Sequence, residues 1–240
     1  ILYNEFGDND TQNLSNMFSQ LSGQTINDIV LDLRYNPGGY VNTAQLISTN
    51  LAPQEAMGNV FLKMTHNDKI NRTDILNFEP GLLAGAASLN YENLYIITSG
   101  NTASASEIVI NCLKPYMAGR LIQVGTATFG KNVAQQLYTD EVQAPMLEFW
   151  LTNSLLSNAE DNSDYYTNGL LPDYEISENL KGELGELGTA QDSLMIPILK
   201  HIETGNFPTA ETEETLSRNG HEKYNFNSSI DIKPKSAILK

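Results

Sequence analysis

The segment Ile26–Arg34 constrains the fold most strongly, because its apolar residues run almost without interruption. A strand covered on both faces has this pattern, and such strands are typical of parallel sheets with helices on either side. Turn-forming residues follow at Asn36–Gly39, and Val41–Leu51 then has helical spacing. A strand, a glycine turn and a helix in this order predict the first unit of an α/β fold.

The rest of the chain repeats this alternation and then adds paired strands. Further strands are expected at Asn59–Met64, Leu94–Ile97, Leu121–Val124, Val133–Tyr138 and Met146–Thr152. Helices are expected at Asp10–Gln24, Ala103–Met117 and Asp192–Thr204. This order predicts an α/β fold with a mixed β-sheet flanked by helices. We place one domain at residues 1–205 and expect 206–240, where apolar residues thin out, to form a polar tail or linker.

The charge balance excludes some partners. There are 14 Lys and Arg residues against 29 Asp and Glu, a net charge of −15. Such a surface repels phosphate backbones, so we expect no nucleic-acid partner. No apolar run approaches the ~18 residues of a membrane span. The chain opens at Ile1 without a basic or apolar leader, so we expect that a targeting segment and an upstream domain are missing from it.

Several common chemistries fit poorly. Gly125–Asn132 is close to a phosphate-binding loop, but Asn132 replaces the Mg²⁺-binding hydroxyl and a strand pattern follows. The histidines His66, His201 and His221 lie outside any glycine-flanked turn, and no G-x-S-x-G motif is present. No metal-ligand spacing occurs, and Cys112 is expected to be buried on a helix. We therefore predict neither a metal nor a cofactor.

One constellation remains for catalysis. Ser99–Glu107 places small residues at a strand-to-helix turn, where Ser104 can sit exposed at the edge of the sheet, as a nucleophile should, with backbone N–H groups nearby. Lys131 follows the next strand in a glycine turn and is available as the base. Turns after neighbouring parallel strands can lie side by side. A serine in such a turn also caps helices, so Ser104 could instead be only an N-cap.

Three ordered segments resemble the C-terminal processing peptidases, also called tail-specific proteases. They are Ile29–Gly39, Thr102–Glu107 and Thr128–Lys131, and Gly169–Asp173 resembles a fourth, weaker signature. The resemblance implies a crotonase/ClpP-like peptidase core. It also implies a serine endopeptidase that cleaves polypeptides near flexible, fairly apolar C-terminal ends. A bacterial cell envelope location, periplasmic or anchored, is implied as well.

The resemblance assigns roles to individual residues. Ser104 corresponds to the nucleophile, with Ser106 as its rival, and Lys131 to the base. Gln135 corresponds to the residue that orients the lysine ammonium, and Glu107 occupies the acidic position three residues after the nucleophile. The separation of Ser104 and Lys131 is slightly longer than is usual in the family.

The oxyanion donors implied by the resemblance are backbone N–H groups. They belong to Ala105 and to one glycine of the Gly38 and Gly39 pair, of which we prefer Gly39. A free lysine has a pKa of ~10.4, so a lysine base needs an apolar pocket that disfavours its charged form. Phe129 and the alanines beside Ser104 are the expected neighbours.

Two alternatives stay open from the sequence. The chain could be a non-catalytic member of the same fold that binds apolar small molecules or a protein partner. It could also be a partner-binding module of a larger envelope complex that uses the acidic segment 156–188.

Overall fold

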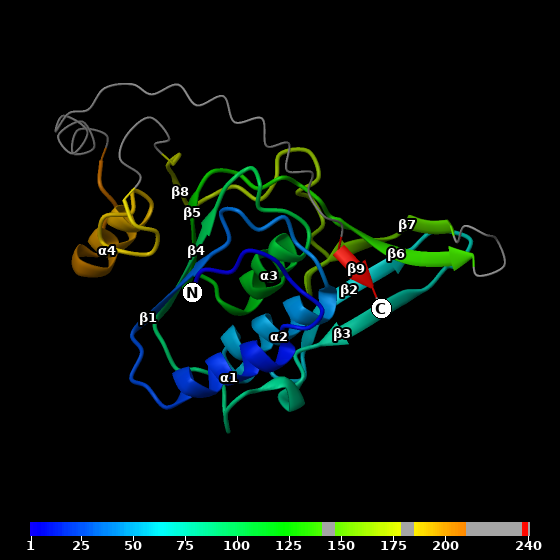
Figure 1. Cartoon of the computed structure of the whole chain (residues 1–240), viewed down its shortest axis with the longest axis horizontal. Helices are drawn as coiled ribbons and strands as arrows, with labels where there is room; N and C mark the ends of the chain where they lie inside the picture. The colour runs from blue at the N-terminus through cyan, green and yellow to red at the C-terminus, as the bar shows by residue number, and fades with distance from the viewer. Residues whose placement is uncertain (141–146, 179–184, 210–236, 240) are drawn as a thin grey trace.

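The computed structural model describes residues 1–140, 147–178, 185–209 and 237–239, and its strands form two sheets (Figure 1). The first sheet is parallel throughout, in the order β1 (Asp28–Asp32), β4 (Asn93–Thr98), β5 (Leu121–Gly125), β8 (Tyr174–Glu175). The second has the order β3 (Thr73–Asn77), β2 (Val60–His66), β7 (Leu147–Ser157), β6 (Val133–Asp140), β9 (Ala237–Leu239). Its pairs are antiparallel except β6 with β9.

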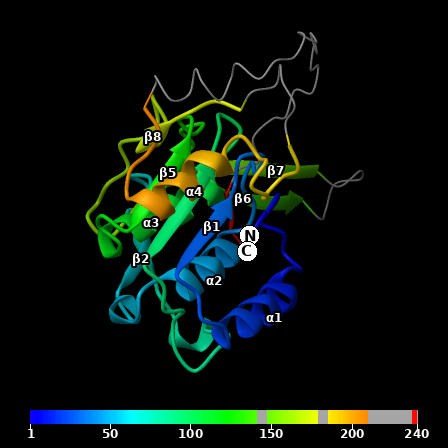
Figure 2. The ribbon, with the colours of Figure 1, turned by 90° about the vertical axis from the view of Figure 1, so that its left-hand side faces the viewer.

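Within the described residues, four α-helices pack around these sheets: α1 (Thr11–Ser22), α2 (Val41–Leu51), α3 (Ala105–Leu113) and α4 (Met195–Thr204). Single 3₁₀ turns occur at Gln54–Ala56, Pro80–Leu82 and Lys114–Tyr116. Figures 1 and 2 show α4 on one side of the parallel strands and α2 with α3 on the other. The parallel sheet is therefore covered on both faces, as the apolar run at Ile26–Arg34 predicted.

Successive side chains of the central strands point to opposite faces of the parallel sheet, which explains why both faces are covered. In β1, Ile29 and Leu31 belong to the main core, whereas Val30 packs against the smaller core under α4. In β4, Tyr95 and Ile97 face that smaller core. Burying each large apolar side chain contributes roughly 1.5–3 kcal/mol, so a strand with apolar residues on both faces is stable only between two layers.

Helix α3 is the centre of the molecule. All nine of its residues are buried, and its apolar side chains share the main core with Phe61 of β2 and Leu156 of β7. The helix therefore lies between the two sheets. Cys112 is buried on it without a disulfide, which confirms the expectation for that residue.

The sequence predictions hold for most elements and miss three strands. The expected strands and helices all occur, with ends shifted by a few residues, but β3, β8 and β9 were not predicted. The strands predicted around an acidic turn are β6 and β7, and the turn after Asp140 lies outside the described residues.

The domain boundary at residue 205 remains a prediction. Phe207 stacks on Tyr174 and His201 with ring centroids 4.4 and 4.2 Å apart, so packing continues just beyond that position. In the described part of the chain, no helix is long and apolar enough to cross a membrane. The same residues contain no cluster of side chains suited to a metal ion.

Candidate active site

Three turns converge at the carboxyl ends of neighbouring parallel strands. Gly38 and Gly39 follow β1, Ser104 follows β4, and Lys131 follows β5. Because β1 pairs with β4 and β4 with β5, these turns lie side by side at one edge of the sheet. Crevices at this edge are where open α/β sheets bind ligands.

Ser104 has an unusual backbone conformation at the start of α3. Its φ of 60° and ψ of −115° lie in a region that non-glycine residues rarely occupy and that costs about 1–3 kcal/mol. Ser104 is also the N-cap of α3, in a capping-box arrangement with Glu107, but its buried Oγ makes no hydrogen bond among the described residues. Ser106, the rival nucleophile, donates its hydroxyl to the Asn36 carbonyl at 3.0 Å. The Ser104 hydroxyl is therefore unengaged but fully buried, which differs from the exposure expected from the sequence, whereas the Ser106 hydroxyl is engaged.

The glycine turn after β1 packs directly against Ser104. A Cβ on Gly38 would come within 2.7 Å of the Ser104 Cβ and 2.9 Å of the Ala105 nitrogen, and φ at Gly38 is +102°. A Cβ on Gly39 would lie 2.2 Å from the Phe6 carbonyl oxygen. Only glycine fits at either position. The N–H of Gly38 donates to Asn36 Oδ1 at 2.9 Å, so this amide is already engaged.

Glu107 joins the serine turn to the lysine turn. Its Oε2 accepts the backbone N–H of Ser104 at 2.7 Å and that of Lys131 at 2.8 Å. Its Oε1 accepts the Gly130 N–H and the Thr128 hydroxyl, both at 2.6 Å. Because one oxygen binds both amides, the Ser104 and Lys131 nitrogens are at most 5.5 Å apart, the sum of 2.7 and 2.8 Å.

The Glu107 side chain is fully buried, which fits a structural role. Burial raises the pKa of the Glu107 carboxyl, and the four donated hydrogen bonds oppose that shift because they favour the ionised form. With both oxygens accepting hydrogen bonds from two segments, the Glu107 side chain holds the two turns together.

Lys131 is partly buried, and burial lowers the pKa of its amine because the charged form loses hydration. The nearby Glu107 charge opposes this lowering. The expected apolar neighbours differ from one another: Ala103 and Ala105 are fully buried, whereas Phe129 is 52 % exposed. The direction of the shift is the one that a lysine base requires.

Gln135 lies on β6, four residues after Lys131. Its side-chain amide donates to the Thr152 hydroxyl of β7 at 3.1 Å, next to an irregularity in the β6–β7 register. Its predicted role in orienting the lysine ammonium stays a prediction.

An arginine cluster supports the glycine turn, and the sequence reasoning missed it. Arg34 is 1 % exposed and pairs with Asp32, Asp192 and Glu178. The Ser99 hydroxyl donates to the Arg34 carbonyl. The cluster therefore anchors the residues before Gly38 to the segment that leads into α4. The sequence did contain a signal for this cluster, because Arg34 stands at the end of an apolar strand, two residues after Asp32.

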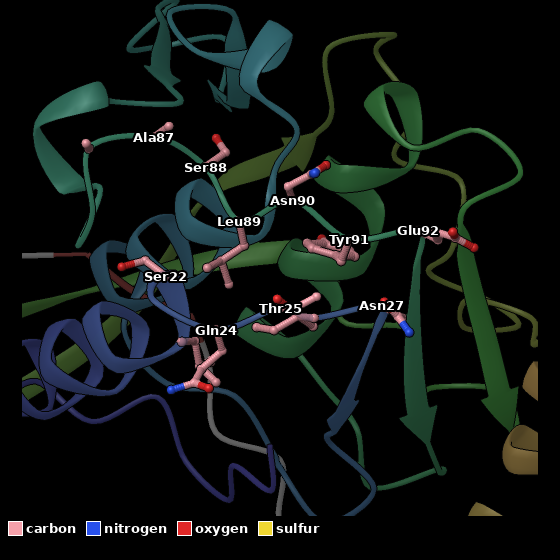
Figure 3. Close-up of a pocket in the computed structure, with 13 residues that line it drawn as sticks. Ser22, Gln24, Thr25, Asn27, Ala87, Ser88, Leu89, Asn90, Tyr91 and Glu92 are labelled. Carbon is pink, nitrogen blue, oxygen red and sulfur yellow. The ribbon is translucent and has the colours of Figure 1, made fainter.

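A polar pocket of about 830 Å³ lies elsewhere (Figure 3). It is lined by residues 21–27 and 86–92, which precede β1 and β4. This is the amino end of the parallel strands, opposite to the edge that carries Ser104. The pocket is therefore separate from the convergent turns.

The family follows from a comparison with known proteins. A model described as "Peptidase family S41" matches residues 1–176, most of the chain. The chain belongs to peptidase family S41. A carboxyl-terminal-processing protease of Picosynechococcus sp. is 33 % identical over 138 residues, which are 58 % of this chain and 30 % of that protein. A carboxy-terminal processing protease of Bacillus subtilis is 27 % identical over 57 % of this chain and 26 % of its own length.

One solved S41 structure agrees with this assignment, and a more distant structure shares the fold. A Bacteroides fragilis protein described as an S41 protease matches with a TM-score of 0.74 and 32 % identity, over 85 % of this chain and 54 % of its own. The photosystem II D1 C-terminal processing protease matches with a TM-score of 0.56 and 21 % identity, over 75 % of this chain and 42 % of that chain. This S41 chain spans less than a third of the length of the curated relatives it matches.

Proposed function

We propose that this chain carries the catalytic domain of a serine endopeptidase in which Ser104 is the nucleophile and Lys131 is the base. The observation that supports this most strongly is the Glu107 carboxylate, which binds the backbone of both residues through one oxygen. The strained conformation of Ser104 and the lowered pKa of Lys131 add to it. A helix cap alone would need neither a positive φ at the serine nor a partly dehydrated lysine beside it.

The reaction runs through an acyl-enzyme. Neutral Lys131 takes the proton of Ser104 Oγ, and the oxygen attacks a peptide carbonyl carbon. The resulting ammonium returns its proton to the leaving amine as the C–N bond breaks. Water then attacks the Ser104 ester with Lys131 again as base, which releases the carboxylate and restores the hydroxyl.

The oxyanion forms close to the glycine turn. We assign its donors to the backbone N–H groups of Gly39 and Ala105, each worth about 3 kcal/mol in the transition state. Gly38 is the weaker choice because its N–H already donates to Asn36. Ala105 is the first residue of α3, where backbone N–H groups lack partners within the helix.

The substrate is proposed to be a polypeptide cut near a flexible C-terminal end. The names of the Picosynechococcus sp. and Bacillus subtilis relatives support this. The sequence resemblance also leads us to propose a bacterial envelope location and a peptide-binding domain elsewhere in the protein. Neither a metal nor a cofactor has a step in this mechanism.

Hydrolysis of casein or a fluorogenic peptide by the complete chain tests the dyad. Ser104→Ala and Lys131→Ala should each lower kcat by at least about 10³-fold. Ser106→Ala is the matched control and should keep most of the activity. Activity that survives in both dyad variants, or that disappears with a chelator, contradicts the mechanism. Labelling of Ser104 by a fluorophosphonate separates the enzyme from a non-catalytic binder of the same fold.

A further inference from the structure

A short segment of the chain itself lies beside the strand that follows Lys131. Strand β9, residues 237–239, pairs in parallel with Ala134, Gln135 and Gln136 of β6. It also lies against α2, the helix that begins after Gly39 (Figure 1). An extended backbone therefore occupies the space between the strand leading from the base and the helix leading from the oxyanion turn.

The direction of β9 relates this position to the reaction centre. Lys131 precedes Ala134 by three residues, or roughly 10 Å of extended chain. The backbone nitrogens of Ser104 and Lys131 are at most 5.5 Å apart, the sum of their two distances to Glu107 Oε2. Because the pairing is parallel, a peptide bound along β6 runs from the reaction centre toward Gln136. Its paired residues then follow the scissile bond and leave with the new amino terminus.

We propose that the edge of β6 at Ala134–Gln136 binds the leaving-side residues of the substrate, and that residues 237–239 hold this edge in the free protein and compete with substrate. The assignment of a leaving side rests on the proposed function, because it takes Ser104 as the point of cleavage. The proposal that this edge of β6 binds a peptide does not rest on the proposed function.

The chemistry of a strand edge suits this role. Hydrogen bonds between backbones need no particular side chains, so an edge strand accepts many sequences. An exposed strand edge has unpaired backbone N–H and C=O groups that can pair with another chain, so proteins usually cover such an edge. An occupant tethered to the same chain acts at an effective concentration of about millimolar, enough to weaken a competing peptide without abolishing its binding.

Removing the backbone donors of β9 tests the proposal. Alternate residues of a strand donate their backbone N–H to the same neighbour, so either Ile238 or Leu239 donates to β6. Proline has no N–H, so replacing both residues, Ile238→Pro with Leu239→Pro, removes that hydrogen bond whichever of them makes it. Ser228→Pro with Ser229→Pro, elsewhere in the chain, is the matched control. Both pairs are made in the complete chain carrying Ser104→Ala, so that the probe is not cleaved.

The probe is a fluorescein-labelled peptide of residues 232–240, and its Kd is measured by fluorescence anisotropy. We expect the Ile238/Leu239 double variant to bind the probe about tenfold more tightly than the control. Equal Kd values in the two proteins overturn the proposal. This comparison needs no hydrolysis, so it remains decisive if the peptidase assignment fails.

The active chain provides the kinetic counterpart. With Ser104 restored, the Ile238/Leu239 double variant should show a KM about tenfold lower than the control at the same kcat, as expected when a competitor is removed. The product fragment with the new amino terminus should inhibit competitively, and the acyl-side fragment should not. Inhibition by the acyl-side fragment alone overturns the leaving-side assignment. If no protein hydrolyses peptide, the proposed function fails and the binding result still stands.

Discussion

The convergent turns and the β6–β7 ribbon, the paired strands Val133–Asp140 and Leu147–Ser157, differ in almost every physical respect. The turns contain buried, saturated polar groups, such as Glu107 with four donors. The ribbon extends away from the body, and its apolar side chains are 43–50 % exposed at Leu147, Phe149, Trp150 and Leu151 (Figure 1). Rigid positioning is thus concentrated where chemistry is proposed, and open apolar surface lies along the strands beside it.

The arginine cluster should be the polar region most sensitive to substitution. Asp192→Asn removes one of the three carboxylate partners of Arg34, whose guanidinium lies 2.6 Å from that carboxylate. Arg34 keeps Asp32 and Glu178, so the loss is that of buried hydrogen bonds between charged groups, about 1.5–3 kcal/mol. Urea unfolding of the parent and variant measures the loss. The surface substitution Asp161→Asn, at a 76 % exposed side chain, is the control and should change stability little. A loss below 1 kcal/mol in Asp192→Asn contradicts a rigid support for the turns.

The same cluster predicts an acid dependence. Burial alone would raise the pKa of Asp192, but the hydrogen bonds from Arg34 outweigh it and the pKa is lowered. Stability from this depressed pKa is present above the ordinary carboxyl pKa and is lost as pH falls through the depressed value. The stability gap between the parent and Asp192→Asn should therefore shrink in acid, as measured by urea unfolding at several pH values.

Glu107→Gln should have the next largest effect. One carboxylate oxygen becomes an NH₂ that faces N–H donors instead of accepting them, and a buried unsatisfied donor costs about 1–3 kcal/mol. We expect that loss of stability together with a fall in kcat, because Ser104 and Lys131 lose their shared anchor. Thr128→Val removes one of the four donors and also the acceptor of the Leu170 N–H, so it should lower stability too. It leaves the bonds to Ser104 and Lys131 in place and should lower kcat less. A Glu107→Gln protein with unchanged kcat would show that the anchor does not position the dyad.

The pH profile tests the electrostatics of the turns. Only neutral Lys131 can accept the serine proton, so kcat/KM should rise with pH through the pKa of that amine. Because burial lowers this pKa, the rise should come below the range of an ordinary lysine. Steady-state kinetics across the pH range provide the measurement. A rate that falls through the same range would argue for an acid in its place.

The ribbon should be the least sensitive region. Trp150→Ser changes a side chain that is 43 % exposed, so the free energy of unfolding should change by less than about 0.5 kcal/mol. The fully buried Phe61→Ala on β2 is the contrasting variant and should cost about 3–5 kcal/mol. Similar losses for the two variants, compared by thermal unfolding, would remove the distinction between the regions.

The sequence predicted what local pattern determines. Val41–Leu51 was placed at the observed bounds, because a glycine turn and Pro53 delimit its helical spacing. The positions of Ser104 and Lys131 followed from two turns after neighbouring strands. Short strands such as β9 carry too few residues for a periodic signal.

Long-range partnerships could not be predicted in the same way. Asp192 meets Arg34 from 158 positions away, and nothing near either residue indicates the other. The sequence resemblance placed Glu107 at the acidic position after the nucleophile but gave it no partner, because its bonds to Gly130 and Lys131 depend on how β5 lies beside β4. Burial and saturation of a charge are properties of the assembled fold.

The most direct test is the titration of the Lys131 amine itself. A ¹³C NMR titration of the lysine Cε signals, with Lys131→Arg to identify the resonance, reports this pKa in the complete chain. We predict a value clearly below ~10.4, the value for a free lysine. A Lys131 pKa at or above that of a free lysine would contradict the proposed base, because the amine would then be charged at neutral pH.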